Sequence, residues 1–178
     1  MYRLRLLILL CLLGLGSLVN GQDQRVNSYK GASSFGIGLG LPYGALGIRG
    51  STYLANGFSI FGGIGYHLVG VGYNFGILAD FPSSHAFQFY LTAMYGTNGA
   101  IWIRGGSDEN RVYAGPSFGM GMKINASGGN YFDLGLLVPI RSSEFMDAYD
   151  RIDNSPFYED VSSPWPVLIV LGYNFNMN

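Results

Sequence analysis

Several stretches of the sequence alternate between large apolar residues and glycine or small polar residues. Residues 33–41 read S-S-F-G-I-G-L-G-L, which places the large side chains on one face of a β-strand and the glycines on the other. The same alternation runs through residues 69–77, 87–95, 117–124, 132–140 and 165–175. Two weaker segments, 44–53 and 57–66, complete eight expected strands, whose lengths of about 9–13 residues are close to what a tilted transmembrane strand requires.

The composition of these segments separates a membrane barrel from a soluble sheet protein. The chain is 48% hydrophobic and 12% charged, and that charged fraction is about half that of an ordinary soluble domain. A soluble β-sandwich or lipocalin needs Lys, Glu, Asp and Arg on its wetted face, whereas Gly, Ser, Asn, Gln and Thr stand opposite the apolar residues here. The pattern therefore predicts an all-β fold, an antiparallel up-and-down transmembrane β-barrel with lipid outside and small polar residues inside.

The N-terminal residues 1–21 have the features of a cleaved secretory signal peptide. Two arginines precede the apolar run Leu6–Leu18, and the residues after that run are small or polar. The run is shorter than the roughly 20 residues of a membrane-spanning helix. We therefore expect residues 22–178 to form the barrel domain. Cys11, the one cysteine, lies within the run, so the mature chain is expected to lack thiols and disulfides.

The spacing of the connections predicts the topology. With a periplasmic N-terminus, short periplasmic turns are expected at residues 54–56, 80–85 and 125–130. The fifth and seventh connections, about 96–110 and 141–164, are long and are expected outside. Residues 100–104 could form a further strand after a turn at residues 97–99. We interpret them as part of an external hairpin that extends the barrel wall.

The signal peptide, the alternating segments and a final strand that ends in an aromatic residue resemble the small bacterial outer-membrane β-barrel family. That family includes OmpX-like barrels and barrels like the OmpA membrane domain. The resemblance implies a location in the Gram-negative outer membrane, in contact with the lipid bilayer and lipopolysaccharide. It also implies the outer-membrane assembly machinery as a partner. That machinery usually reads an aromatic residue at the end of the chain, whereas three residues follow Phe175 here.

Three charged residues interrupt the predicted strands: Arg49, Lys123 and Asp133. A charge on the lipid side costs about 2–4 kcal/mol near the bilayer midplane, so these side chains are expected to point inward or to lie at the interface. Lys123 and Asp133 flank one turn and are predicted to pair across it, with Arg49 joining a lumen charge network. An eight-stranded barrel is narrow enough to be filled by side chains, which favours a plugged lumen over a selective pore.

The acidic loop from Ser142 to Asp160 contains six of the eleven acidic residues. These are Glu144, Asp147, Asp150, Asp153, Glu159 and Asp160. Phe145, Tyr149 and Ile152 have the spacing of the apolar side of a short surface helix. The loop could contact a surface partner or bind divalent cations at the lipopolysaccharide surface, although a solvated loop is the simpler interpretation. No metal, cofactor or nucleic-acid partner is expected, because the sequence lacks the corresponding motifs.

These observations leave three functional hypotheses. The preferred one is a non-enzymatic outer-membrane barrel with a structural or surface-interaction role through its extracellular loops. The alternatives are a narrow porin-like channel and, less favoured, a lipid A-modifying enzyme. The resemblance includes lipid A-modifying barrels that use a histidine with a serine and an acid near the outer rim. Of the two histidines here, His67 lies at the external end of the third expected strand but is followed by Leu68 and Val69 instead of a His-x-Ser motif. The other, His85, is most simply a solvated residue of an expected turn.

Overall fold

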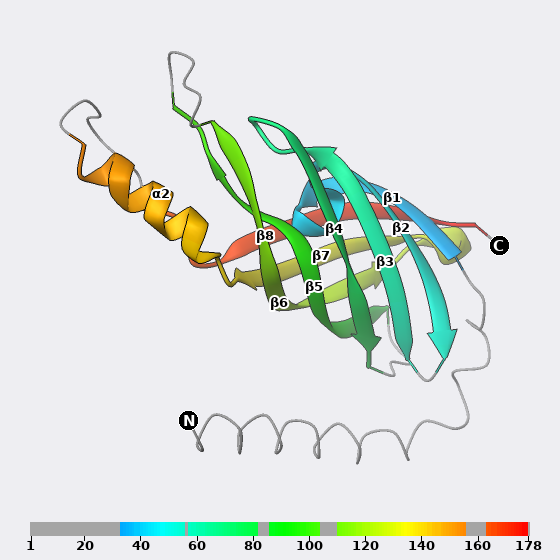
Figure 1. Cartoon of the computed structure of the whole chain (residues 1–178). Coiled ribbons are helices and arrows are strands. Elements are labelled where there is room, and N and C mark those ends of the chain that lie inside the picture. The colour runs from blue at the N-terminus through cyan, green and yellow to red at the C-terminus, as the bar shows by residue number, and fades with distance from the viewer. Residues whose placement is uncertain (1–32, 56, 82–85, 104–109, 156–162, 178) are drawn as a thin grey trace, which may run out of the picture.

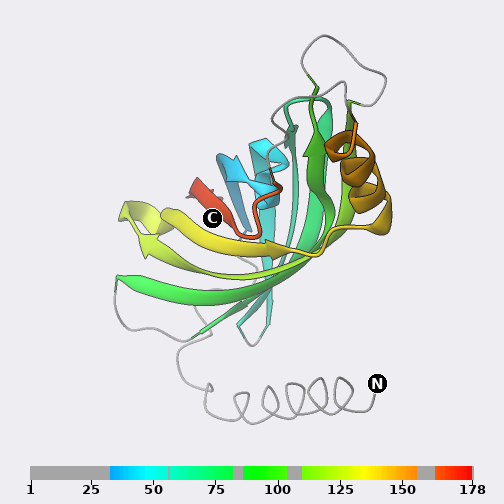
Figure 2. The ribbon, with the colours of Figure 1, turned by 90° about the vertical axis from the view of Figure 1, so that its left-hand side faces the viewer.

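The alternating segments form a sheet that closes on itself. The computed structural model describes residues 33–55, 57–81, 86–103, 110–155 and 163–177, so the expected signal peptide lies outside the described residues. In the described part, eight antiparallel strands follow in chain order around the wall, and the last strand pairs with the first (Figures 1 and 2). The predicted fold class, an antiparallel up-and-down barrel of eight strands, is confirmed.

The strands and the shorter elements follow one another along the chain. The strands are β1 (Ser33–Gly40), β2 (Ala45–Ala55), β3 (Phe58–Tyr66), β4 (Val71–Asp80), β5 (Phe87–Ile101), β6 (Arg111–Asn125), β7 (Tyr131–Pro139) and β8 (Leu168–Asn176). Two 3-10 turns, η3 (Leu41–Tyr43) and η4 (Ser127–Gly129), and one helix, α2 (Ser143–Asp153), lie in the described connections. No helix of the described residues is both long and apolar enough to cross a membrane.

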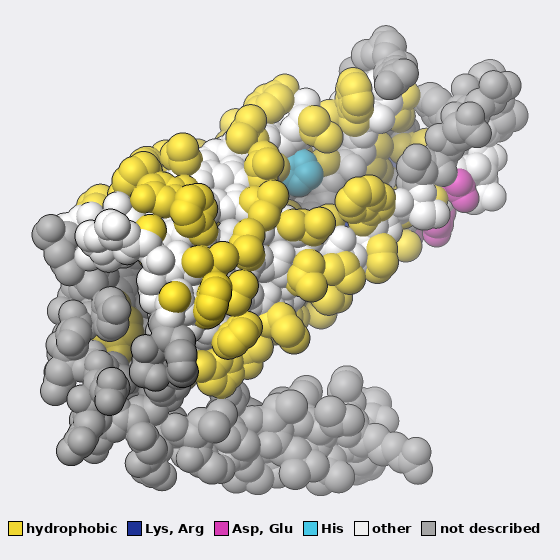
Figure 3. Space-filling view, turned by 180° about the vertical axis from the view of Figure 1, so that it is seen from behind, with side chains coloured by type: hydrophobic (Ala, Val, Ile, Leu, Met, Phe, Trp, Pro, Cys, Tyr) yellow, Lys and Arg dark blue, Asp and Glu magenta, His cyan; other side chains and the backbone are white. Residues whose placement is uncertain are grey.

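The wall of the barrel carries its large apolar side chains on the outside. Ile37, Phe75 and Ile169 are exposed by 53%, 58% and 58%. Glycines of the same strands face the interior, where a Cβ atom at Gly38 or Gly172 would meet the ring of Tyr43. Figure 3 shows hydrophobic side chains along the outside of the wall, with the visible acidic side chains at the end from which α2 projects. An apolar exterior with a polar interior is the arrangement of a transmembrane barrel.

The two ends of the barrel differ. The connections β2–β3, β4–β5 and β6–β7 are short and lie at the same end as the first residue of β1 and the last residue of β8, as predicted. We call this the turn end. The connections β1–β2, β3–β4, β5–β6 and β7–β8 lie at the opposite end, the loop end. The loop end carries α2, which follows β7.

Strands β5 and β6 extend beyond the rest of the wall at the loop end. The pairing of β5 with β4 stops at Gly96, and the pairing of β6 with β7 stops at Ser117. Residues 97–101 and 111–114 continue to pair with each other across a β-bulge between Thr97 and Gly99, so they project as a two-stranded hairpin (Figure 1). The predicted hairpin that extends the barrel wall is confirmed for the described residues. We call this segment the projecting hairpin.

Strand β8 begins later than predicted. The alternation suggested a start at Trp165, whereas the strand starts at Leu168. Pro166 explains the difference, because it has no N–H group to donate to a neighbouring strand and it restricts the backbone of the residue before it.

The lipid-facing assignment can be tested with Leu134→Arg in β7. Leu134 lies on the exposed face near the middle of its strand. The substitution should lower the free energy of unfolding from lipid vesicles by about 2–4 kcal/mol, because a charge would enter the hydrocarbon region. Urea titration provides the measurement. Asp147→Arg in the exposed part of α2 is the control, and equal stability of the two variants would contradict the assignment.

Candidate functional site in the barrel lumen

An ion pair crosses the lumen between Arg49 and Asp133. Alternation along β2 and β7 turns both side chains inward, and β1 and β8 separate these strands around the wall. Nη1 of Arg49 lies 2.6 Å from Oδ2 of Asp133, and the two side chains are 1% and 0% exposed. Charges buried this fully need close partners, because each loses its hydration.

Neutral side chains complete the surroundings of this ion pair. The hydroxyl of Tyr90 donates to Oδ1 of Asp133 at 2.6 Å, and the hydroxyl of Tyr43 donates to Oδ2 at 3.2 Å. Asn174 accepts from Nη2 of Arg49 at 3.0 Å and donates to the Tyr43 hydroxyl at 2.9 Å. The ring of Tyr43 lies 4.6 Å from the guanidinium carbon, in a cation–π contact. We call these five residues the central network.

A second ion pair lies closer to the turn end. Nζ of Lys123 in β6 is 2.7 Å from Oδ1 of Asp80, the last residue of β4. The side chains of Lys123 and Asp80 are 10% and 7% exposed. The ammonium group also lies 5.3 Å from the ring of Tyr131 and 5.9 Å from the ring of Tyr90.

The predicted ion pair between Lys123 and Asp133 is wrong, although both side chains and Arg49 face the lumen as expected. Lys123 and Asp133 are opposite each other in the register of β6 and β7. Asp133 is nevertheless paired with Arg49, and Lys123 with Asp80. From the sequence, Asp80 is expected in a turn. In the structure the inward alternation of β4 continues through Leu78 to Asp80, which supplies a closer carboxylate for Lys123.

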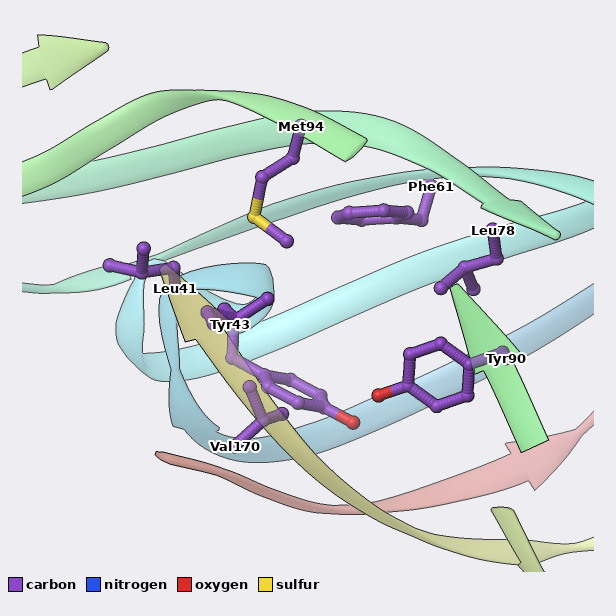
Figure 4. Packing of buried hydrophobic residues seen from close by; sticks show 8 residues of the cluster. Leu41, Tyr43, Phe61, Leu78, Tyr90, Met94 and Val170 are labelled. Carbon is purple, nitrogen blue, oxygen red and sulfur yellow. The ribbon is translucent and has the colours of Figure 1, made fainter. Parts of the chain in front are cut away.

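The lumen also holds an apolar cluster that the alternation did not indicate. Its members are Leu41, Tyr43, Phe61, Leu78, Tyr90, Met94, Leu137 and Val170. Each is at most 5% exposed. In Figure 4 the hydroxyl groups of Tyr43 and Tyr90 point toward each other, which is consistent with their shared hydrogen bonds to Asp133. The expectation of a lumen filled by small polar residues alone is therefore corrected.

Helix α2 is attached to the projecting hairpin by a separate apolar cluster. Phe145, Ala148 and Ile152 of the helix are buried against Ile101 and Tyr113 of the hairpin. The rings of Phe145 and Tyr113 meet edge to face at 5.4 Å. This confirms the predicted short surface helix with its apolar side.

The N-terminus of α2 is capped, and its polar side is acidic. The hydroxyl of Ser142 accepts a hydrogen bond from the backbone N–H of Phe145 at 3.3 Å. The guanidinium of Arg141 lies 5.2 Å from the ring of Phe145. The predicted acidic residues within the helix are all exposed: Glu144, Asp147, Asp150 and Asp153. Glu159 and Asp160 lie outside the described residues.

His67 follows β3 at the loop end, as predicted. Its ring is partly buried, and its Nδ1 has no hydrogen-bond partner among the described residues. Burial lowers the pKa of His67, since desolvation disfavours the charged imidazolium. His85 lies outside the described residues. Within the described part of the chain, no three His, Cys, Asp or Glu side chains gather in a way that could hold a metal ion.

Comparison with known proteins adds one solved structure. No protein-family model and no curated protein sequence matches the chain. The chain is similar to the backbone structure of the Yersinia pestis outer membrane protein Ail in a phospholipid bilayer nanodisc. The match has a TM-score of 0.40 and 15% sequence identity, and it covers 83% of this chain and 100% of the other. The assignment of the barrel rests on the strand pairing described above.

The two ion pairs make a prediction for double-mutant cycles. Arg49→Met or Asp133→Asn alone should each cost about 3–5 kcal/mol of unfolding free energy, because each leaves a buried charge unpaired. The double variant should cost less than the sum of the single variants. Lys123→Met with Asp80→Asn should also couple, but more weakly, because this pair is less buried.

Lys123→Met combined with Asp133→Asn is the matched control for these cycles. These residues are neighbours in register without sharing an ion pair, so their coupling should be smaller than that of Arg49 with Asp133. The coupling energies come from urea unfolding in lipid vesicles. The largest coupling in the Lys123 and Asp133 cycle would contradict the observed pairing.

The partly buried ring of His67 gives a pH prediction. Its folded pKa lies below the unfolded value of 6.5, so the unfolded chain takes up a proton first as the pH falls. The stability contributed by neutral His67 is therefore present above pH 6.5 and declines as the pH falls toward the folded pKa. NMR titration of a His85→Gln variant checks the folded pKa. A midpoint at or above 6.5 would contradict the prediction.

Proposed function

We propose that this chain is a non-enzymatic outer-membrane protein of Gram-negative type, with a closed lumen and a role in contacts at the cell surface. Residues 1–21 direct export and are removed, and residues 22–178 insert as the barrel. The turn end faces the periplasm, and the loop end faces outward with the lipopolysaccharide. The loop end makes the surface contacts.

The proposal rests on one contrast: the lumen contains buried side chains, whereas the loop end presents exposed polar side chains. In the interior, buried ion pairs and an apolar cluster occupy the described lumen. Such an interior supports a closed lumen, because an ion that entered it would have to displace buried side chains from these contacts. The membrane part then serves to hold the loop end in place.

The construction of the loop end supports a contact surface with a defined shape. Asn98 is 2% exposed and lies at the base of the projecting hairpin. Its amide donates to the carbonyl oxygens of Pro116 at 3.1 Å and Ile140 at 3.0 Å. These bonds connect the hairpin to the start of the β7–β8 connection, and the second apolar cluster then fixes α2 on the hairpin. These contacts already order the hairpin and α2 in the free protein. Such a surface suits recognition, because little further conformational entropy is lost on binding.

The exposed polar side chains of α2, which packs on the projecting hairpin, suit polar partners at the cell surface. The exposed acidic side chains of α2 occupy the part of the helix that is not packed against the hairpin. Lipopolysaccharide bridged by divalent cations and a surface protein are the two kinds of partner that such a face could contact.

A conductance measurement tests the closed lumen. The purified chain in planar lipid bilayers should show no steady conductance steps, because ions would have to enter the desolvated central network. A porin of known conductance in the same bilayers is the positive control. Reproducible unitary steps from the wild-type chain would overturn the proposal in favour of a narrow channel.

The orientation is tested by labelling single cysteines in intact cells. Cys11 lies within the expected signal peptide, so an introduced cysteine would be the one thiol of the mature chain. Asp147→Cys in α2 should react with a membrane-impermeant maleimide, and Ala126→Cys at the turn end should react only after the outer membrane is permeabilised. The reverse pattern would show that the loop end faces the periplasm.

A further inference from the structure

The short connection between β1 and β2 folds into the barrel instead of projecting from it. Leu41, Pro42 and Tyr43, which form η3, are all buried. The turn contacts β1, β2, β3, β4, β5 and β8, so it touches strands around most of the wall. Leu41 and Tyr43 are members of the apolar cluster in the lumen (Figure 4). The first connection therefore fills part of the barrel interior.

The backbone on both sides of the turn has the geometry that this inward path requires. Gly40 has a φ of 110° and Gly44 a φ of 69°, which L side chains rarely adopt. Ala45 follows with a φ of 81°, an unfavourable value for a residue with a Cβ atom. The carbonyl oxygen of Leu41 accepts from the backbone N–H of Gly44 at 2.9 Å and from the amide of Asn74 at 2.8 Å.

Inward-facing glycines of three strands form the surface on which the turn rests. A Cβ atom at Gly63 would collide with the carbonyl oxygen of Pro42, and one at Gly65 would lie 2.5 Å from that of Tyr43. A Cβ atom at Gly72 would lie 2.5 Å from the carbonyl oxygen of Gly44. We call Gly47, Gly63, Gly65 and Gly72 the glycine bed, since a Cβ atom at each would meet the backbone of residues 42–44.

Glycines of the same strands that face outward have no such neighbour. Gly50 and Gly62 are cross-strand partners in β2 and β3. A Cβ atom at either would meet no atom within 4 Å. The backbone of the turn is the first obstacle at Gly63 and Gly72, whereas a Cβ atom at Gly47 or Gly65 would also meet the backbone of the neighbouring strand. Without the turn, a wall lined by glycine would leave a space beside the central network.

Tyr43 joins the turn to the central network. Its hydroxyl lies between Asp133 and Asn174, at 3.2 Å and 2.9 Å, and its ring covers the guanidinium of Arg49. Withdrawal of the turn would remove one donor from Asp133 and expose the ion pair on the side toward the loop end. The turn and the charges therefore close the lumen together.

From these contacts we propose that the turn 41–44 is a built-in plug, and that displacing it opens a water-filled path into the lumen from the loop end. This inference rests on the proposed closed lumen and names the element that closes it. The glycine bed is the seat of the plug. A bulky side chain at Gly63 would meet the backbone of Pro42 first, so it would keep the plug from docking.

The test compares two adjacent glycines of β3. Gly63→Val places a branched side chain against the backbone of Pro42 in the turn, and Gly62→Val places the same side chain on the lipid face, where a Cβ atom meets no atom within 4 Å. Each is combined with Val170→Cys as a reporter, because Val170 is 0% exposed and belongs to the apolar cluster. The proteins are refolded into phosphatidylcholine vesicles, and heat-modifiable migration identifies the folded fraction.

Reaction of the reporter with a membrane-impermeant maleimide is the first readout. We expect labelling with Gly63→Val to be at least about tenfold faster than with Gly62→Val or with the reporter alone, because the thiol becomes accessible when the plug leaves its seat. Conductance in planar bilayers is the second readout, and steps should appear with Gly63→Val only. Both readouts use a chain with Cys11→Ser.

A second variant keeps the test decisive if Gly63→Val does not fold. Leu41→Ser combined with Tyr43→Ser leaves the bed intact and removes the two apolar anchors of the plug, so it should give the same increase in labelling and the same steps. Protection of the reporter and electrical silence in a folded plug variant would overturn the inference and leave the proposed function standing. Conductance of the unaltered chain would instead contradict the proposed closed lumen.

Discussion

The rest of the structure depends on the requirement that every backbone N–H and C=O group inside a membrane has a partner. An open sheet would leave two unpaired edges in hydrocarbon, so the sheet closes through the pairing of β1 with β8. Closure divides the environment of each strand into an outside made of lipid and an inside made of protein. The alternation of large apolar residues with glycine follows from this division. The hydrophobic residues of the strands thus lie mainly on the surface, whereas those of a soluble protein lie in its core.

Closure with eight strands also produces a lumen that is too narrow for bulk water. Charged groups that face it lose hydration, and this loss is tolerable only where an opposite charge and further hydrogen bonds are within reach. Asp133 illustrates the condition, because a guanidinium and two tyrosine hydroxyls surround its carboxylate. The same narrowness explains the inward turn, since backbone can fill space that glycine-lined strands leave vacant. Ion pairs, aromatic rings and a folded turn therefore provide the interior packing.

Lipid and the closed lumen constrain the wall on both faces, whereas the loop end is free to vary in shape. There the two longest strands leave their neighbours and carry α2 on a hydrophobic cluster of their own. This cluster is separate from the apolar cluster in the lumen, so the packing of α2 on the projecting hairpin does not depend on the packing inside the barrel. A change in the surface of α2 can thus alter contacts outside without disturbing the central network. This separation supports the proposal that the loop end makes the surface contacts.

The sequence by itself determined the features that depend on local periodicity. The strand faces, the short turns at one end, the external hairpin and the apolar side of α2 all follow from which residues recur at intervals of 2 or about 3.6. The inward direction of Arg49, Lys123 and Asp133 also follows, because lipid cannot accommodate their charges. Each of these conclusions needs only neighbours in the chain and the nature of the two solvents.

Only the tertiary structure decided which groups meet inside the barrel. Asp133 faces Lys123 in register but binds Arg49, because the lumen is so narrow that a side chain from β2 reaches across it. Asp80 became the partner of Lys123 since β4 continues further than its clear alternation suggested. The inward path of residues 41–44 was also invisible in the sequence, where glycine indicates a small side chain but not what lies beside it. Contacts across a closed lumen join residues that are distant in the chain, and no local periodicity encodes them.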